Sequence, residues 1–196
     1  MKKTINIAVV GLGQVGSYLL NELNIKKKDI ELKTGKKINV VAISARNINK
    51  KRQFKINKKI FFKNPLEILK KTKVDILFEV IGQSDGVSKK VVETALRNKT
   101  HVITPNKALI SKHGNELAKI AEQNDVNLEF EASVAGGIPI LRSIKEGLAT
   151  NKISKVYGIL NGTSNYILSE MENSNQSFSD VLKKAQKLGY AEPGNP

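Results

Sequence analysis

The segment that says most about the architecture is Ile5-Asn6-Ile7-Ala8-Val9-Val10-Gly11-Leu12-Gly13-Gln14-Val15-Gly16. Its first half is a short apolar run that ends at a glycine, which is typical of a buried parallel strand. Its second half has the spacing G-x-G-x-x-G, and the apolar residues that continue from it recur at helical spacing. A strand, this glycine pattern and a helix in direct succession predict the opening unit of a dinucleotide-binding fold.

The glycines suit that chemistry for physical reasons. Gly11 permits a tight turn, Gly13 lets the backbone approach a pyrophosphate, and Gly16 allows the helix to contact the strand closely. The phosphates then meet unpaired backbone N–H groups at the positive end of a helix dipole. We therefore expect the loop to bind the cofactor through Gly11, Leu12, Gly13, Gln14, Val15 and Gly16. The alternative is that these glycines serve only the turn.

Strand-like and helix-like segments alternate through the first two thirds of the chain. Further apolar runs of strand length occur at residues 38–43, 74–80, 101–104 and 126–131. Between them we expect a basic loop after residue 23, an irregular polar stretch at 47–59, a short helix opened by Pro65 with Asn64 as its cap, and helices at 88–96 and 106–123. This alternation predicts an α/β fold over residues 1–135, a Rossmann-type doubly wound parallel sheet with its ligand site at the carboxyl edge.

The pattern changes after Ala135-Gly136-Gly137. We expect a helix at 138–148, a strand at 153–160 and two further helices at 164–171 and 178–188. Residues 136–196 thus predict the start of an α+β substrate and dimerisation domain. We expect this second domain to stop before it is complete.

The composition narrows the class of protein. The 33 lysines and arginines exceed the 18 acidic residues, but they fall on expected loops and helix surfaces, with no tryptophan among them for base stacking. We therefore expect solvated faces and no nucleic-acid partner. The absence of cysteine excludes disulfides and fits a reducing cytosol. No apolar run approaches the roughly 20 residues of a membrane span. We expect a soluble cytoplasmic protein that does not enter a membrane and has no transition-metal site.

The end of the second strand bears on the choice of dinucleotide. A carboxylate there accepts hydrogen bonds from the ribose 2′-OH of NAD, but this strand ends Ser44-Ala45-Arg46-Asn47. An arginine suits a 2′-phosphate, so Arg46 favours NADP, with NAD as the alternative cofactor. The alternative interpretation of Arg46 and its basic neighbours is a solvated loop.

Three segments together resemble one enzyme family. The segment Val102-Ile103-Thr104-Pro105-Asn106-Lys107-Ala108-Leu109, the segment from Glu131 to Ile140 and the segment from Gly158 to Leu168 are similar, in order, to elements of homoserine dehydrogenases. The resemblance covers essentially the whole chain. It implies hydride transfer between NAD(P)H and L-aspartate 4-semialdehyde, which gives L-homoserine on the route to threonine, methionine and isoleucine. It also implies a small-molecule substrate and a homodimeric full-length protein.

The resemblance also implies roles for individual residues. Lys107 would contact nicotinamide and substrate, and Glu192 would hold the substrate amino group, which makes these two the expected catalytic residues. Thr163 is a candidate substrate contact, or else the N-cap of a helix that starts at Ser164. Without the resemblance, Lys107 is equally well a surface lysine and Glu192 an exposed loop residue.

A monovalent cation such as sodium is a further implication of the resemblance. It would be bound largely by backbone carbonyls at Glu131, Val134, Gly136 and Ile138. Pro105 departs from the family's usual alanine, and Gly194-Asn195 replace its usual Asp-Pro. The family's second lysine, its proton donor, would lie beyond residue 196, so we expect this chain alone to bind cofactor and turn over poorly or not at all.

Two other functions stay open on the residues alone. One is a non-catalytic dinucleotide-binding module, in which changes at Lys107 or Glu192 have no effect on function. The other is a dehydrogenase of a related amino-acid substrate, which requires a different second domain.

Overall fold

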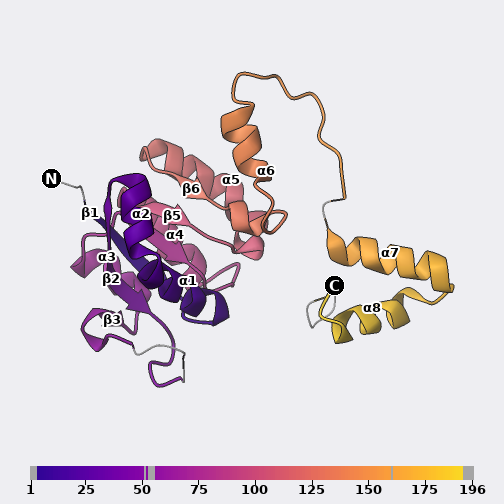
Figure 1. Cartoon of the computed structure of the whole chain (residues 1–196), viewed down its shortest axis with the longest axis horizontal. Helices are drawn as coiled ribbons and strands as arrows, with labels where there is room; N and C mark the ends of the chain where they lie inside the picture. The colour runs from indigo at the N-terminus through magenta and orange to yellow at the C-terminus, as the bar shows by residue number, and fades with distance from the viewer. Residues whose placement is uncertain (1–3, 51, 53–55, 160, 192–196) are drawn as a thin grey trace. The chain divides into compact units, whose positions relative to one another are not determined.

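A computed structural model describes residues 4–50, 52, 56–159 and 161–191 of the chain. The chain divides into two compact units, Met1–Arg142 and Ser143–Pro196. The first unit holds the sheet and its covering helices, and the second holds two packed helices (Figure 1).

The first unit is built on a six-stranded sheet in which all strands are parallel. Its strands are β1 (Thr4–Val10), β2 (Lys37–Ser44), β3 (Phe61–Phe62), β4 (Ile76–Glu79), β5 (His101–Ile103) and β6 (Leu128–Glu129). They lie in the order β3-β2-β1-β4-β5-β6, so the direction of strand addition reverses at β1. This confirms the predicted Rossmann-type sheet. The carboxyl ends of all six strands lie along one edge, where open α/β sheets bind ligands.

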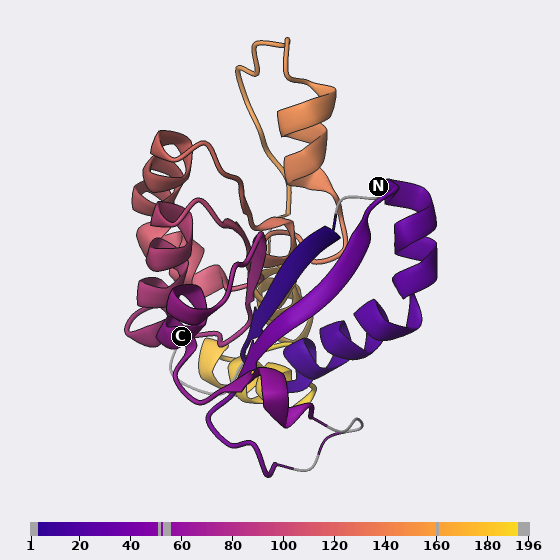
Figure 2. The same ribbon diagram turned by 90° about the vertical axis from the view of Figure 1, so that its left-hand side faces the viewer.

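Alternate side chains of β1 enter two cores, one on each face of the sheet. Ile7 and Val9 pack in a cluster that includes Leu19 and Leu20 of α1 (Gln14–Ile25). Ala8 and Val10 belong to the larger cluster, which α4 (Val87–Arg97) and α5 (Lys107–Gln123) cover. Figure 2 shows α1 on one side of the sheet and α4 and α5 on the other. Because both faces are buried there, residues 7–10 of β1 form a continuous apolar run rather than an alternating one.

Short helical segments connect the larger elements. As expected, Pro65 opens a helical turn, η2 (Pro65–Glu67), and the Asn64 side chain accepts a hydrogen bond from the Leu66 amide at 3.1 Å. The remaining short segments are η1 (Lys58–Ile60), α3 (Ile68–Lys71), η3 (Glu131–Ser133), α6 (Ile140–Arg142) and a π-helical turn, η4 (Ser143–Gly147).

Two elements of the first unit differ from the sequence-based expectation. The basic stretch after residue 23 is not simply a loop, because it contains a helix, α2 (Lys27–Thr34), which ends at Gly35 in the left-handed conformation (φ 68°). No residue of α2 is buried, so it has no apolar stripe from which to predict it. The edge strand β3 was also missed, because its two residues are too few to show a period.

The second unit contains α7 (Gly162–Ser174) and α8 (Phe178–Lys187), which pack around Ile167, Val181 and Ala185. The strand expected at 153–160 is wrong for the described residues 153–159, which form no regular secondary structure and are exposed. A strand needs a neighbour for its backbone hydrogen bonds, and no described strand pairs with this segment. Throughout the described part of the chain, each helix is too short or too polar to traverse a bilayer.

Candidate functional site

The glycine-rich turn joins β1 to α1 at the carboxyl edge of the sheet. Gly11 has a φ of 102°, and a Cβ there would lie 2.5 Å from the Val80 carbonyl oxygen. A Cβ on Gly16 would lie 1.9 Å from the Gly11 carbonyl oxygen. A Cβ on Gly13, by contrast, would meet nothing within 4 Å. Two of the glycines are therefore required for close backbone packing, and the third borders open space.

The start of α1 presents backbone N–H groups at the carboxyl edge of the sheet. No side chain among the described residues caps this helix, whose N-cap is Gly13. Gln14 and Val15, in its first turn, are exposed. The N–H groups of a helix's first turn have no partner within the helix, so they remain available to an anion.

A cleft of about 490 Å³ opens beside this turn. It is lined by Gly11, Leu12 and Gly13, by the residues that follow β2, and by Val80, Ile81 and Gln83, which follow β4. Its charged lining residues are all cationic: Arg46, Lys50, Arg52 and Lys63. The structure thus brings the glycine turn and Arg46 together in one cleft, as the sequence predicts. It adds Lys63, which sequence analysis did not single out.

Arg46 and Arg52 have different surroundings in this cleft. Arg46 is exposed. The Arg52 guanidinium donates hydrogen bonds to the carbonyl oxygens of Asn47 (2.9 Å), Lys50 (2.8 Å) and Leu12 (3.3 Å). Arg52 therefore ties the loop that carries Arg46 to the glycine turn, 40 residues away in sequence. Arginine suits this task because its planar fork carries five donors.

A buried carboxylate lies at the end of β4. Glu79 is fully buried, and its Oε1 accepts hydrogen bonds from the amides of Ile81 (2.8 Å) and Gly82 (3.4 Å) and from the Ser88 hydroxyl (3.1 Å). Its Oε2 accepts from the Thr104 hydroxyl at 2.6 Å. The same oxygen accepts from Nδ2 of Asn106 at 3.2 Å. Every one of these donors comes from the loops or helix that follow β4 and β5.

Lys107 is the first residue of α5 and is exposed. The residue before it, Asn106, caps the helix, since its Oδ1 accepts from the Leu109 amide at 3.1 Å. The Nδ2 of Asn106 also donates to the Gln83 carbonyl at 2.8 Å. Lys107 thus lies at the carboxyl edge as predicted, although it is not among the residues that line the cleft.

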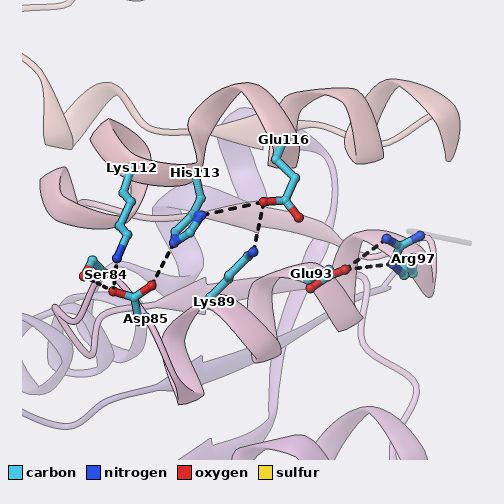
Figure 3. A network of polar contacts seen from close by, with 8 residues as sticks. All are labelled: Ser84, Asp85, Lys89, Glu93, Arg97, Lys112, His113 and Glu116. Carbon is cyan, nitrogen blue, oxygen red and sulfur yellow. Dashed lines mark hydrogen bonds and ion pairs between the residues drawn. The ribbon is translucent and has the colours of Figure 1, made fainter.

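A polar network joins α4 to α5 near the same edge (Figure 3). The Asp85 carboxylate, just before α4, lies 2.8 Å from the Lys112 ammonium and 2.9 Å from Nε2 of His113. Lys89 and Glu116 form a second pair between the helices at 2.9 Å. The hydrogen bond from Lys112 is the main reason why the pKa of Asp85 lies well below its ordinary value of 3.8.

Comparison with known proteins gives two family matches in chain order. Residues 11–131 match the family described as the NAD binding domain of homoserine dehydrogenase, and residues 139–195 match homoserine dehydrogenase itself. The chain belongs to the homoserine dehydrogenase family. The first match covers the glycine turn, the cleft and Lys107, and the second covers α7 and α8.

Individual relatives agree with this assignment. The homoserine dehydrogenases of Neisseria gonorrhoeae and Bacillus subtilis are 42% and 37% identical to the chain over 97% of its length. The crystal structure of a homoserine dehydrogenase from Thiobacillus denitrificans superposes with a TM-score of 0.83, at 40% identity over 98% of this chain and 44% of that one. The chain covers 43% and 44% of the Neisseria and Bacillus enzymes, so it spans less than half the length of these homoserine dehydrogenases.

The segment that the sequence analysis assigned to a cation forms a tight turn. Both Glu131 carboxylate oxygens accept backbone hydrogen bonds from α6, from Leu141 at 3.0 Å and Arg142 at 2.8 Å. The Glu131 and Ile138 carbonyls accept from Val134 (3.1 Å) and Ile140 (2.8 Å). The Glu131 side chain therefore holds α6, and two of the four carbonyls expected to bind a cation already accept one backbone hydrogen bond each.

The substrate residues expected from the homoserine dehydrogenase resemblance lie in the second unit. The helix there begins at Gly162, and its cap is Asn161, whose side chain accepts from the Ser164 amide at 3.1 Å. The alternative role of Thr163 as the N-cap is thus wrong. Its hydroxyl donates instead to the Tyr190 carbonyl and ties α7 to the end of the chain. Glu192 lies outside the described residues.

Sequence analysis missed Glu79 and Arg52 as parts of this site. The signal for Glu79 was present, since a carboxylate inside the apolar run Ile76-Leu77-Phe78-Glu79-Val80 has to be buried with partners. Arg52 gave no comparable signal, because one arginine among neighbouring lysines looks like a solvated face.

Proposed function

We propose that this chain forms the dinucleotide-binding domain (residues 1–135) and the start of the substrate domain (136–196) of a homoserine dehydrogenase. The complete enzyme interconverts L-aspartate 4-semialdehyde and L-homoserine by hydride transfer, in the biosynthesis of threonine, methionine and isoleucine. The observation that carries the proposal is the glycine turn that opens into a cationic cleft, in a chain that belongs to this family.

The residues around the turn fit a dinucleotide. A pyrophosphate requires close approach to backbone N–H groups, and Gly13 leaves open space where any other residue would project a side chain. The uncapped first turn of α1 offers donors with a positive dipole end. Gly11, Leu12, Gly13, Gln14, Val15 and Gly16 are accordingly the residues that bind the pyrophosphate or shape its loop.

NADP is the favoured dinucleotide because of the charges at the end of β2. No carboxylate occurs among the described residues that line the cleft, whereas four cations do. A 2′-phosphate carries negative charge that these cations neutralise, and the exposed Arg46 offers it a planar pair of donors. A free 2′-OH would lack its usual carboxylate acceptor, so NAD is the weaker ligand.

The dinucleotide, when bound, supplies or accepts the hydride, and the chain's own residues orient the reactants. Lys107 is at the carboxyl edge and contacts nicotinamide and substrate. Thr163 and Glu192 bind the substrate, with Glu192 holding its amino group by a charge-assisted hydrogen bond. A sodium ion is bound by the carbonyls of Glu131, Val134, Gly136 and Ile138, since carbonyl oxygens suit a hard cation.

We further propose that the complete protein is a cytoplasmic homodimer. The support is its family membership together with a sequence that has no cysteine. Sedimentation of the complete gene product would give twice the mass of one chain.

The deciding experiment follows oxidation of NADPH by L-aspartate 4-semialdehyde, measured on the complete product of the gene. We expect turnover that falls by at least about 100-fold in Lys107→Ala and Glu192→Gln, in line with the loss of a group that contacts the reacting atoms. Lys119→Ala, an exposed change further along α5, is the matched control and should retain turnover. Cofactor binding without turnover would favour the non-catalytic module instead.

A further inference from the structure

Glu79 is the one fully buried carboxylate among the described residues, and the proposed chemistry does not use it. Burial of a charge costs several kcal/mol unless hydrogen bonds compensate. Five donors surround this carboxylate, so its charge is compensated. An apolar residue, like Leu77 two positions earlier, would fill the same place in the sheet without the free-energy cost of burying a charge. The arrangement therefore calls for an explanation beyond packing.

The donors show what Glu79 holds in place. The amides of Ile81 and Gly82 belong to the loop after β4, and Thr104 and Asn106 belong to the loop after β5. One side chain thus fixes the two successive loops at the carboxyl edge on the β4–β5 side of the sheet. A dinucleotide crosses a doubly wound sheet at the reversal of strand order, which here is β1. Its ribose phosphate end lies at β2, so its nicotinamide end extends toward β4 and β5.

Asn106 transmits this restraint to Lys107. Its Oδ1 caps α5, so its Nδ2 has to face Glu79 and the Gln83 carbonyl. Its own amide donates to the Thr104 hydroxyl at 3.1 Å. Both polar atoms of the Asn106 side chain therefore have partners, and the direction in which α5 starts depends on the acceptor oxygen that Glu79 provides.

We propose that Glu79 is a positioning residue for the nicotinamide end of the site. Its carboxylate holds the loops after β4 and β5 so that Lys107 and the nicotinamide meet in one arrangement. This inference rests on the proposed function, because it presupposes that the cleft binds a nicotinamide dinucleotide. It assigns Glu79 no contact with cofactor or substrate.

The test compares two ligands in the 196-residue chain. NADPH occupies both ends of the site, whereas 2′,5′-ADP lacks the nicotinamide. In Glu79→Gln, one carboxylate oxygen becomes an NH2 group, which cannot accept a hydrogen bond. The remaining oxygen should stay on the side with three donors, so Nδ2 of Asn106 loses its acceptor. We expect the Kd of NADPH to rise about tenfold, as for the loss of one hydrogen bond to a charged group, with the Kd of 2′,5′-ADP within about twofold. The enhancement of NADPH fluorescence on binding should also be smaller in Glu79→Gln than in the wild type.

Thr100→Val is the matched control. Thr100 is buried near the amino end of β5, and its hydroxyl donates to the Val74 carbonyl at 3.0 Å. Thr100→Val therefore removes a buried side-chain hydrogen bond at the opposite edge of the sheet from the site. It should lower the melting temperature without changing the ratio of the two affinities. Asn106→Ser serves if Glu79→Gln does not fold, because serine keeps the helix cap but has no Nδ2 donor. It should weaken NADPH binding selectively as well.

The outcomes separate the two proposals. If Glu79→Gln, or Asn106→Ser in its place, weakens both ligands in parallel, Glu79 is merely structural and the inference is overturned. Unchanged binding of both ligands overturns it equally. A wild-type chain that binds neither ligand refutes the dinucleotide site itself, and the positioning role with it.

Discussion

Alanine at Gly16 and alanine at Gly13 should have opposite effects, although the two glycines lie three residues apart in one turn. At Gly16 the new Cβ would lie 1.9 Å from a backbone oxygen of Gly11 and 2.9 Å from the Val80 side chain. At Gly13 it would meet nothing within 4 Å, and the residue's φ of −73° is one that alanine adopts without strain. We therefore expect Gly16→Ala to destabilise the fold and Gly13→Ala to impair binding without any loss of stability.

The magnitudes follow from these distances. To reach ordinary contact at 3.4 Å, α1 has to move by about 1.5 Å away from the turn. Over-packing costs about 1–3 kcal/mol, and a backbone obstacle places this case near the upper end. For a unit of this size, about 3 kcal/mol lowers the melting temperature by roughly 10 °C. Gly13→Ala should raise stability slightly, by about 0.4–1 kcal/mol, because alanine restricts the unfolded chain.

Two measurements on the same samples check both expectations. Thermal unfolding followed by circular dichroism gives the stability, and titration of NADPH fluorescence gives the Kd. Gly13→Ala should lose at least about tenfold in NADPH affinity, because its methyl group occupies the approach of the pyrophosphate. A wild-type melting temperature for Gly16→Ala, or wild-type NADPH affinity for Gly13→Ala, would refute this account of the turn.

Three further changes test the surroundings of the cleft. Arg46→Ala should raise the Kd of NADPH about tenfold and that of NADH less than twofold, since only NADPH carries the 2′-phosphate; equal losses in a fluorescence titration would argue against NADP preference. Arg52→Lys keeps the charge but loses the fork that reaches four backbone carbonyls, so the affinities for NADPH and NADH should fall together. A selective loss of NADPH affinity would contradict this role of Arg52. Asp85→Asn should destabilise the fold at neutral pH. Because the pKa of Asp85 is depressed in the folded protein, its stabilising effect is complete well above pH 3.8 and is lost as the pH falls below that value. The free energies of unfolding of wild type and variant, measured in urea, should converge on acidification. A difference that does not change with pH would show that the charge of Asp85 is not the cause of the destabilisation.

The sheet and its order of elements were predictable because local rules and tertiary packing agree there. The run at residues 7–10 is apolar on both faces, and the glycines behind it fit only one kind of turn. The Asn64 cap and the α5 boundary at Asn106 follow from side chains that satisfy free amides. In each case the type of residue is compatible with only one local structure of low free energy.

The errors arose where structure depends on residues far away or on no burial at all. The helix α2 has no buried side chain, so nothing in its pattern distinguishes it from a loop. Residues 153–159 have strand-like composition, but composition does not supply the neighbouring strand. The importance of Glu79 depends on donors up to 27 residues away, which a linear reading does not bring together.

The segment at 152–159 has a consequence for handling the protein. Ile153, Val156, Tyr157 and Ile159 are all more than 40% exposed, in a stretch with high β-propensity. An unpaired stretch of this kind is a template for pairing between molecules, and natural sequences oppose such association with interrupting charges. Lys152 and Lys155 are those charges here, and the Lys155 ammonium lies 5.6 Å from the Tyr157 ring centre. We expect them to oppose aggregation, so acetylation of these two lysines should make concentrated solutions of this chain cloud.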